Sequence, residues 1–396
     1  SNLDPLGKMI EHGFHITGVV PNNEAIVAVA QKVLGVETMS ILVVGLLMNL
    51  LIARFTKFKY VFLTGHHSLF MACLMSAVLG TAGLSGIELI LVGGFLMGAW
   101  SAISPAIGQS YTSKVTDGDE IALGHFGSLG YYLSAWVAKY VGKAEESTED
   151  IEIPEKWGFL RDSTLSTALT MIVFYLIAAI AAGSEFVATL SGSMSPYLFA
   201  VMSAMNFAVG VAIVYSGVRM ILGDLIPAFQ GIATKIIPNA IPAVDCAVFF
   251  TYAPTAVVLG FISSFIGGII GMLILGAVGG VLIIPGLVPH FFCGATAGIY
   301  GNATGGRRGA AVGAFLNGLA ITFLPALALP VLGQLGFQNT TFGDADFAVM
   351  GLVLGNAFEW IGMAGIYGVV VIAALVLIIP NFIKTKGKVI NYVEEE

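Results

Sequence analysis

Two adjacent histidines stand inside an apolar run and raise the question of what they bind. The run is FLTGHHSLFMACL, residues 62–74, and the histidines are His66 and His67. A neutral imidazole both donates and accepts hydrogen bonds, which suits ligands rich in hydroxyl groups. We expect His66 to face such a ligand; the alternative is an interfacial histidine pair that faces lipid headgroups. His67 points about 100° away around a helix and is expected to be structural.

A carboxylate in the middle of another apolar run is the strongest candidate for a functional group. Asp245 lies in PNAIPAVDCAVFFTYAPTAVVLGF, residues 238–261. An ionisable group at membrane depth costs several kcal/mol unless a protein group or a ligand satisfies it. The other interpretation is a structural Asp that satisfies helix ends beside Pro242.

Polar residues break two further apolar stretches. In GVVPNNEAIVAVA, the three residues that directly follow Pro21 are Asn22, Asn23 and Glu24. They either contact a ligand or cap the start of a helix. His125 lies in the glycine-rich stretch TDGDEIALGHFGSLGYYLSAW, residues 116–136, which predicts either a re-entrant hairpin or an extramembrane loop. A metal site is disfavoured because no further His, Cys or carboxylate stands near the paired histidines at ligand spacing.

The composition places these groups inside a membrane protein. Hydrophobic residues make up 57% of the 396 residues and charged residues only 10%, against roughly 25% charged in soluble domains. Apolar stretches near the length of a spanning helix recur, which predicts an all-α polytopic protein with roughly nine to eleven embedded segments. Irregular backbone persists at membrane depth only where protein buries it or where it lines a wet cavity. The interruptions therefore predict a substrate pathway.

A short pattern that occurs twice in the sequence and a further interrupted apolar stretch support the prediction of a substrate pathway. Pro-Asn precedes an acidic residue twice, within residues 21–24 and 238–245, as in transporters built from repeats. Residues 283–309, IIPGLVPHFFCGATAGIYGNATGGRRG, predict a hairpin that ends at an arginine pair. Its polar candidates are His290, Thr296 and Asn302.

Charge patterns predict the orientation and exclude one class of partner. Lys and Arg gather at residues 53–59, 307–308 and 384–388, which the positive-inside rule assigns to the cytoplasm. The sequence carries no basic patch of the kind that binds nucleic acid. We also expect the natural protein to begin before Ser1. The three cysteines are expected to be buried apolar thiols: Cys73, Cys246 and Cys293.

These motifs resemble a known family, the ascorbate-type membrane component, IIC, of the bacterial phosphoenolpyruvate-dependent sugar phosphotransferase system. The resemblance rests on LTGHH, on TDG followed by GH, on GKAEESTED, on SGVRM, on PNAIPAVDCAVFFTYAPTAVV, and on LIIPG followed by FFCGATAG. In this order the motifs run through residues 16–308 and cover most of the chain.

The resemblance implies a homodimeric, all-helical carrier in the bacterial inner membrane, surrounded by lipid. A single membrane-embedded domain over 1–396 would contain core segments 16–142 and 229–309, a polar connector over 143–164 and a cytoplasmic tail over 381–396. The core, with two re-entrant hairpins, would move by an elevator-type motion against a dimerisation scaffold. Soluble IIA and IIB proteins would supply phosphate, and the resemblance implies neither a cofactor nor a metal.

The resemblance also implies a set of sugar contacts in this chain. L-ascorbate or a related polyhydroxylated sugar would contact Asn22, Asn23, Glu24, His66, His125 and Asp245. Thr64 and Thr296 are further candidates, which come from the polar interruptions of the apolar runs rather than from the resemblance. Phe70 and Phe126 stand where ascorbate-handling relatives have glutamines, so aromatic stacking on a sugar ring replaces two hydrogen-bonding groups. Asp245 or His66 would act as the base in phosphoryl transfer.

Two other functions remain open from the residues alone. In a proton-coupled secondary transporter of a small polar solute, Glu24, Asp245 and the histidines would relay protons. An intramembrane lipid-modifying enzyme is the weaker alternative, because it needs a tight motif such as HxxxxD, which the sequence lacks.

Overall fold

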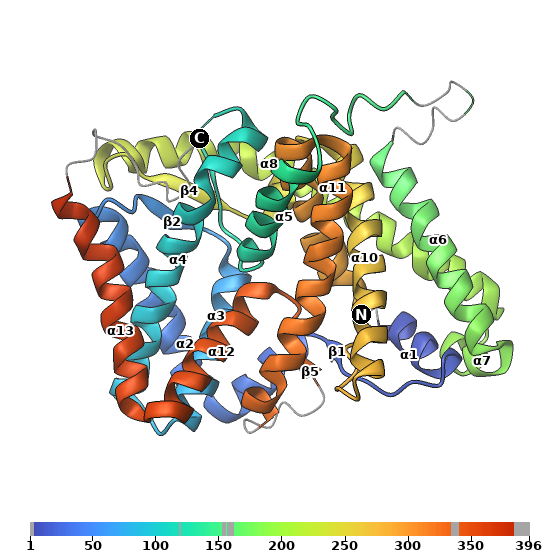
Figure 1. The fold of residues 1–396 in the computed structure, drawn as a ribbon, viewed down its shortest axis with the longest axis horizontal. Helices are drawn as coiled ribbons and strands as arrows, with labels where there is room; N and C mark the ends of the chain where they lie inside the picture. The colour runs from blue at the N-terminus through green and yellow to red at the C-terminus, as the bar shows by residue number, and fades with distance from the viewer. Residues whose placement is uncertain (1–3, 119, 153–155, 157–161, 334–339, 384–396) are drawn as a thin grey trace. The chain divides into compact units, whose positions relative to one another are not determined.

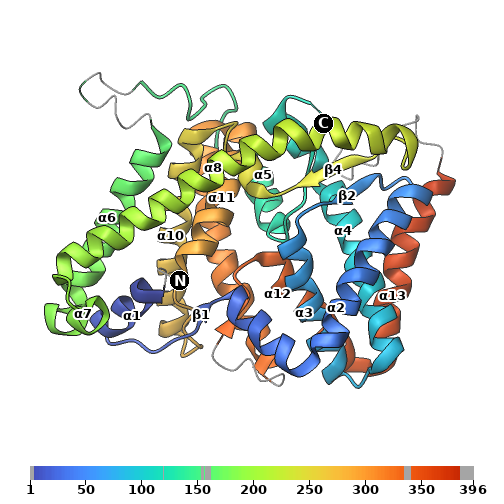
Figure 2. The same ribbon diagram turned by 180° about the vertical axis from the view of Figure 1, so that it is seen from behind.

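The computed structural model describes residues 4–118, 120–152, 156, 162–333 and 340–383 (Figures 1 and 2). These residues are mostly helical and form two compact units. One unit contains residues 1–20, 134–221 and 247–322, and the other contains 21–133, 222–246 and 323–396. The expected core segment 229–309 is divided between them. Parts of the expected connector and most of the expected tail lie outside the described residues.

Seven helices among the described residues are long and apolar enough to cross a membrane. Such a helix needs about 20 predominantly apolar residues to span the hydrocarbon core. The prediction of a helical polytopic protein is therefore confirmed at this level. The candidate spans are Leu34–Phe55, Gly86–Thr116, Thr164–Ala182, Pro196–Val214, Pro254–Ala277, Leu287–Val331 and Met363–Phe382.

The first unit is built on helices that pack through glycine. Its elements are α1 (Asp4–Gly13), α6 (Ser163–Ala182), α7 (Ser184–Ser191), α10 (Pro254–Ala277) and parts of α5 (Ser128–Val141), α8 (Pro196–Lys235) and α11 (Leu287–Gly333). A Cβ added to Gly260 would lie 2.4 Å from the Gly294 carbonyl oxygen, and one added to Gly318 would lie 2.1 Å from that of Ser264. The two arms of α11 therefore approach α10 backbone to backbone, as small residues permit between membrane helices.

Helix α11 turns back on itself at Gly306. This residue has φ 61° and ψ −156°, and a Cβ on Gly301 would lie 2.5 Å from the Gly309 carbonyl oxygen. Eight residues of straight helix would separate these positions by about 12 Å. The sequence predicted a hairpin within residues 283–309, whereas in the structure α11 runs as one helical arm from Leu287 to the turn at Gly306, and the returning arm lies beyond that stretch.

The second unit consists of a helical layer around a small parallel sheet. Its helices are α2 (Asn23–Phe55), α3 (Gly65–Thr81), α4 (Gly86–Thr116), α12 (Ala345–Ile361), α13 (Met363–Ile378) and the 3₁₀ turn η2 (Ile379–Phe382). Of the short helix α9 (Cys246–Phe249), only Cys246 belongs to this unit, and the rest belongs to the first. Helix α2 packs on α3 and α4, and α12 packs on α3 and α13 (Figures 1 and 2). The expected helix start after Pro21 is confirmed, because α2 begins at Asn23.

The strands are the part of the fold that the all-α prediction lacks. β2 (Tyr60–Phe62), β4 (Ile241–Val244) and β3 (Ala122–Leu123) form a parallel sheet in the order β2-β4-β3. A second sheet pairs β1 (Val20–Pro21) with β5 (Thr340–Thr341). All residues of β2, β3 and β4 are buried.

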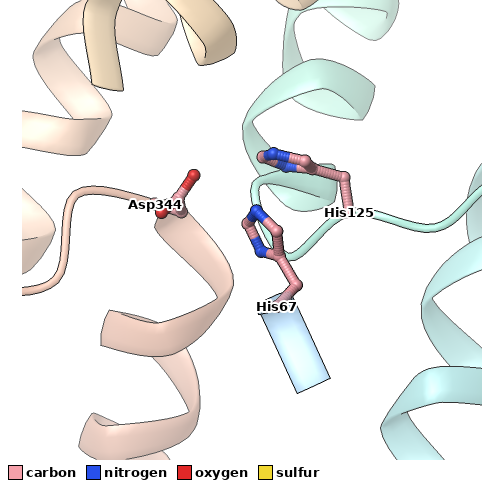
Figure 3. Close-up of side chains that lie close together, drawn as sticks. All are labelled: His67, His125 and Asp344. Carbon is pink, nitrogen blue, oxygen red and sulfur yellow. The ribbon is translucent and has the colours of Figure 1, made fainter. Parts of the chain in front are cut away.

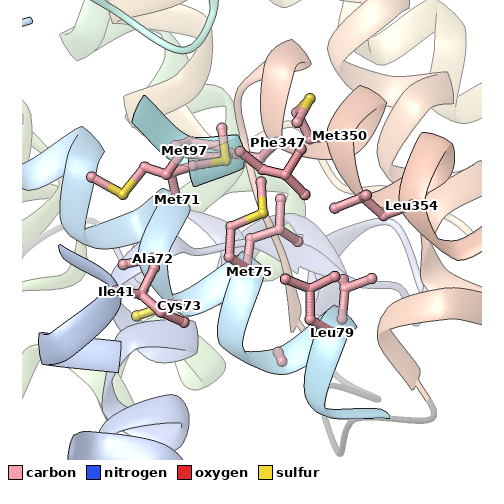
Figure 4. Close-up of a cluster of buried hydrophobic side chains, with 14 of the residues drawn as sticks. Ile41, Met71, Ala72, Cys73, Met75, Leu79, Met97, Phe347, Met350 and Leu354 are labelled. Atoms are coloured by element: carbon pink, nitrogen blue, oxygen red, sulfur yellow. The ribbon is translucent and has the colours of Figure 1, made fainter. Parts of the chain in front are cut away.

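A methionine-rich apolar core supports the sheet from the α3 side. Figure 4 shows Met71 and Met75 of α3 beside Met97 of α4 and Phe347 and Met350 of α12. Unbranched Met side chains fill irregular gaps between helices of different direction. Cys73 lies in the same core, and all three cysteines are buried as expected.

A buried carboxylate joins three helices of this unit. The fully buried Asp346 accepts hydrogen bonds from Trp100 Nε1 of α4 at 3.1 Å, from Ser128 Oγ at 2.7 Å and from the Leu129 N–H at 3.0 Å. Its own N–H donates to the Phe126 carbonyl at 2.9 Å. Asp346 therefore fixes the first turn of α5, and the loop before it, against α4 and α12.

Replacing Gly306 with Ala is expected to destabilise the protein more than the same change at Gly192. Both residues have φ 61°, but only at Gly306 would the new Cβ meet backbone, 2.2 Å from the Lys143 carbonyl oxygen. Each variant has a left-handed penalty of about 1–2 kcal/mol, to which Gly306→Ala adds a clash of about 1–3 kcal/mol. Thermal unfolding in detergent measures the difference, and equal melting temperatures would contradict the proposed turn.

Asp346→Asn is expected to lower stability by about 2–3 kcal/mol, the scale of a hydrogen bond to a buried charge. In either orientation the amide NH₂ faces a donor, the N–H of Leu129 or that of Trp100. The exposed Asp150→Asn substitution is the control for the change of charge. A melting temperature for Asp346→Asn equal to that of the control would show that Asp346 does not hold the helices together.

Candidate functional site

The carboxyl ends of three parallel strands carry the polar residues that the sequence singles out. The segment Thr64–His67 follows β2, Gly124 and His125 follow β3, and Asp245 follows β4. Because the strands are parallel, these ends meet at one edge of the sheet, the usual place for ligands in parallel sheets. Residues from three distant parts of the chain thus come together within one unit.

The register of the sheet is set by close backbone contacts to β4. The Leu63 N–H donates to the Ala243 carbonyl at 2.9 Å, and the Gly124 N–H donates to the Val244 carbonyl at 2.7 Å. A Cβ on Gly124 would lie 2.3 Å from the Ala243 carbonyl oxygen, so only glycine allows this approach. The glycine before His125 therefore serves to bring the histidine to the strand that carries Asp245.

Lys59 anchors the other end of β2. Its Nζ donates to the carbonyls of Ala53 at 3.0 Å and Arg54 at 3.3 Å in the last turn of α2, where a cation is favourable. Burial, together with the positive charge of Arg54, lowers the pKa of Lys59. The basic stretch at residues 53–59 thus also holds the beginning of β2 against the end of α2.

His66 and Asp245 form the open part of the site. His66 Nε2 lies 3.4 Å from Asp245 Oδ2, and the two side chains are 58% and 28% exposed. A carboxylate beside an imidazole can orient the ring. The pair therefore presents a carboxylate and an imidazole side by side to a bound group.

His67, His125 and Asp344 form the buried part of the site, shown in Figure 3. The imidazole rings of His67 and His125 have centroids 3.8 Å apart, and ligand-capable atoms of all three residues lie within 4.8 Å of one another. A second group with the same limit contains His125, Asp245 and Cys246. Among the described residues, these are the two sets of side chains whose chemistry and spacing would allow a metal ion. The spacing in the sequence had disfavoured a metal site, because each set combines residues that lie far apart along the chain.

Asp344 is the functional candidate that sequence reasoning missed. Asn23 Nδ2 donates to its Oδ2 at 2.7 Å, and Asn23 Oδ1 accepts from the Gly343 N–H at 3.0 Å. The signal was present in GDADF, residues 343–347, where two carboxylates open an apolar helix. Asn23 thus contributes to the site by holding Asp344.

Of four further residues predicted from the sequence to bind the ligand, the structure describes the side chains of three. The N–H of the exposed Asn22 donates to the Thr341 carbonyl, and the side chain of Glu24 lies outside the described part of the chain. Phe70 packs edge-on to His66, whereas the fully buried Phe126 stacks on Phe62 with centroids 4.5 Å apart. Phe70 therefore borders His66, whereas Phe126 belongs to the packed apolar core.

Two threonine candidates belong to different units. Thr64, beside His66, is buried, and among the described residues its hydroxyl has no hydrogen-bond partner. Thr296 lies in the other unit, where its hydroxyl donates to the Phe292 carbonyl at 2.7 Å. Thr64 is therefore the threonine whose hydroxyl a ligand at the sheet edge would satisfy.

Comparison with known proteins shows which proteins this chain resembles. A curated relative from Mycoplasma pneumoniae, named ascorbate-specific PTS system EIIC component, is 24% identical over 343 residues. The match covers 76% of this chain and 51% of the relative, so the chain spans about half the length of that protein.

A family model described as PTS system sugar-specific permease component matches residues 1–346. Together with the seven candidate spans, this match places the chain in the bacterial inner membrane as a multi-pass protein. Because the model covers most of the 396 residues, the chain belongs to the family of sugar-specific permease components, IIC, of the phosphotransferase system.

Proposed function

We propose that this chain binds a polyhydroxylated sugar, L-ascorbate or a close relative, and carries it inward for phosphorylation by a separate IIB protein. The observation that carries the proposal is the convergence of His66, His125 and Asp245 at one edge of a parallel sheet. These side chains offer donors and acceptors suited to hydroxyl groups.

Two features of the open part of the site support sugar binding. The buried Thr64 hydroxyl has no partner among the described residues, which is costly unless a ligand supplies one. The edge-on Phe70 ring lies 5.8 Å from the His66 ring, measured between centroids, and places an apolar group beside the polar pair. A sugar combines hydroxyl groups with apolar C–H faces, so both features match it.

The substrate class follows from the family and from the two aromatic residues. The Mycoplasma pneumoniae relative is named as ascorbate-specific. Phe70 and Phe126 replace two glutamines expected for ascorbate, and the buried, stacked Phe126 offers packing rather than hydrogen bonds. We therefore include related polyols and pentose-like sugars in the substrate class.

The His66–Asp245 pair would serve as the base in phosphoryl transfer. The S–P bond of a phosphocysteine on IIB breaks while a bond forms between phosphorus and the sugar hydroxyl oxygen. The hydroxyl proton passes to the pair, whose 3.4 Å separation allows the carboxylate to stabilise the imidazolium. Soluble IIA would recharge IIB, so this chain needs no phosphorylated residue of its own.

The transport cycle belongs to the same proposal. In it, two copies of the protein associate in the lipid bilayer and the sugar-binding part of each moves across the membrane by an elevator-type motion. The direct approach of glycine backbones on α10 and α11 provides stiff packed units suited to rigid-body movement.

Asp245→Asn in the full-length protein is expected to lower phosphorylation-coupled uptake of labelled L-ascorbate at least ~10-fold. The change removes a hydrogen bond to a charged group, worth about 1.5–3 kcal/mol. Uptake is measured in vesicles with and without phosphorylated IIB, and Asp150→Asn is the control on an exposed carboxylate.

The same assay separates the alternatives. Accumulated sugar phosphate that requires IIB supports the proposal. Uptake that persists without IIB and collapses with the proton gradient would contradict it and favour a proton-coupled transporter. A signal from another polyol but not from ascorbate would keep the carrier and change its substrate.

A further inference from the structure

We propose that His67, His125 and Asp344 form a buried subsite that holds one hydroxyl oxygen of the sugar, the hydroxyl of its terminal CH₂OH group. The inference rests on the proposed function and adds His67 and Asp344 to the residues that select the substrate. Figure 3 shows the two imidazoles and the carboxylate turned toward a common space.

The spacing of the three side chains fits an oxygen atom. Their ligand-capable atoms lie within 4.8 Å of one another. Three atoms that each lie about 2.8 Å from a common oxygen, the length of an ordinary hydrogen bond, can be up to about 4.8 Å apart in an equilateral arrangement. The spacing of the cluster is therefore compatible with one hydroxyl oxygen held by all three side chains.

The hydrogen-bond pattern around the imidazoles also favours a hydroxyl over a metal. The Gly127 N–H donates to His125 Nδ1 at 3.1 Å, and the Phe126 N–H donates to His67 Nδ1 at 3.4 Å. An acceptor Nδ1 carries no proton, so the neutral ring carries its proton on Nε2. Each ring therefore offers an N–H donor, whereas a metal ligand needs a bare nitrogen there.

Burial keeps both rings neutral. His67 and His125 are each only 3% exposed and lie outside the seven candidate spans. Burial lowers the pKa of His67 and of His125, and the nearby Asp344 and Asp245 oppose this for His125 only in part. Two neutral imidazoles then supply two N–H donors without introducing positive charge.

The three groups match the hydrogen-bonding capacity of one hydroxyl. A hydroxyl oxygen accepts two hydrogen bonds and donates one. The Nε2–H groups of His67 and His125 supply the two donors, and the Asp344 carboxylate accepts the hydrogen bond that the hydroxyl donates. Asn23 donates to Asp344 Oδ2 at 2.7 Å and thereby fixes the carboxylate in this role.

The gradient of exposure indicates which hydroxyl is held. The site is open at His66, whose side chain is 58% exposed, and closed at Asp344, which is 5% exposed. A ligand that enters beside His66 and Asp245 reaches the buried cluster with its narrow end. A terminal CH₂OH arm is slim enough for this, whereas a ring hydroxyl would bring the ring with it.

The test compares a sugar with its deoxy analogue in the full-length protein. The probes are L-ascorbate and 6-deoxy-L-ascorbate, and equilibrium binding is measured in detergent. A site that hydrogen-bonds a hydroxyl rejects the analogue strongly, so wild-type protein should bind the deoxy compound at least ~30-fold more weakly. The His67→Phe variant keeps the stacking on Phe347. It should bind L-ascorbate more weakly than wild-type protein, and its preference for L-ascorbate over the deoxy compound should fall below ~3-fold.

His12→Phe is the matched control, because His12 likewise stacks on a phenylalanine, Phe186, but lies in the other unit. It should keep the wild-type preference. Equal affinities of wild-type protein for the two probes would overturn the subsite. So would a Co²⁺ absorption spectrum, showing stoichiometric metal binding, that is lost in Asp344→Asn.

If L-ascorbate does not bind at all, the ascorbate assignment fails and the subsite is tested separately with xylitol and 1,5-dideoxyxylitol. A preference for xylitol that His67→Phe abolishes would keep the subsite with a different sugar. Failure of wild-type protein to prefer the hydroxylated member of either pair would overturn it.

Discussion

The backbone hydrogen bonds of β4 are the interactions on which the candidate site depends. β4 is the central strand and joins β2 on one side and β3 on the other, in parallel. Backbone that is buried in a membrane protein must find partners within the protein, and the sheet satisfies this for three irregular segments at once. The same bonds place His66, His125 and Asp245 at one edge, so folding and function share one set of contacts.

Buried carboxylates then determine how the surrounding helices are held. Asp346 joins α4, α5 and α12, and Asp344, two residues before it, lies beside the buried histidines. The two side chains have different neighbours: Asp346 is surrounded by donors from the fold, whereas Asp344 accepts a hydrogen bond from Asn23 and lies beside His67 and His125. A structural carboxylate and the carboxylate that we propose for ligand binding thus begin the same helix.

The sequence predicted those parts of the site in which a polar residue interrupts an apolar run. His66, His125 and Asp245 stand out for that reason, and composition alone indicated a helical membrane protein. The sheet could not be predicted, because its strands are two to four residues long and each is paired with a segment far away in sequence. The sequence did not predict Asp344 as a candidate functional residue, because two carboxylates at the start of a helix resemble an ordinary N-terminal cap.

We propose that the carboxyl edge of the β2-β4-β3 sheet binds the sugar. A cryo-electron microscopy structure of the full-length protein in lipid nanodiscs, with saturating L-ascorbate or the transported polyol, tests this directly. Ligand density is expected between His66, His125 and Asp245, with its end toward Asp344. Density at a place away from this edge, with the sheet residues unchanged, would contradict it.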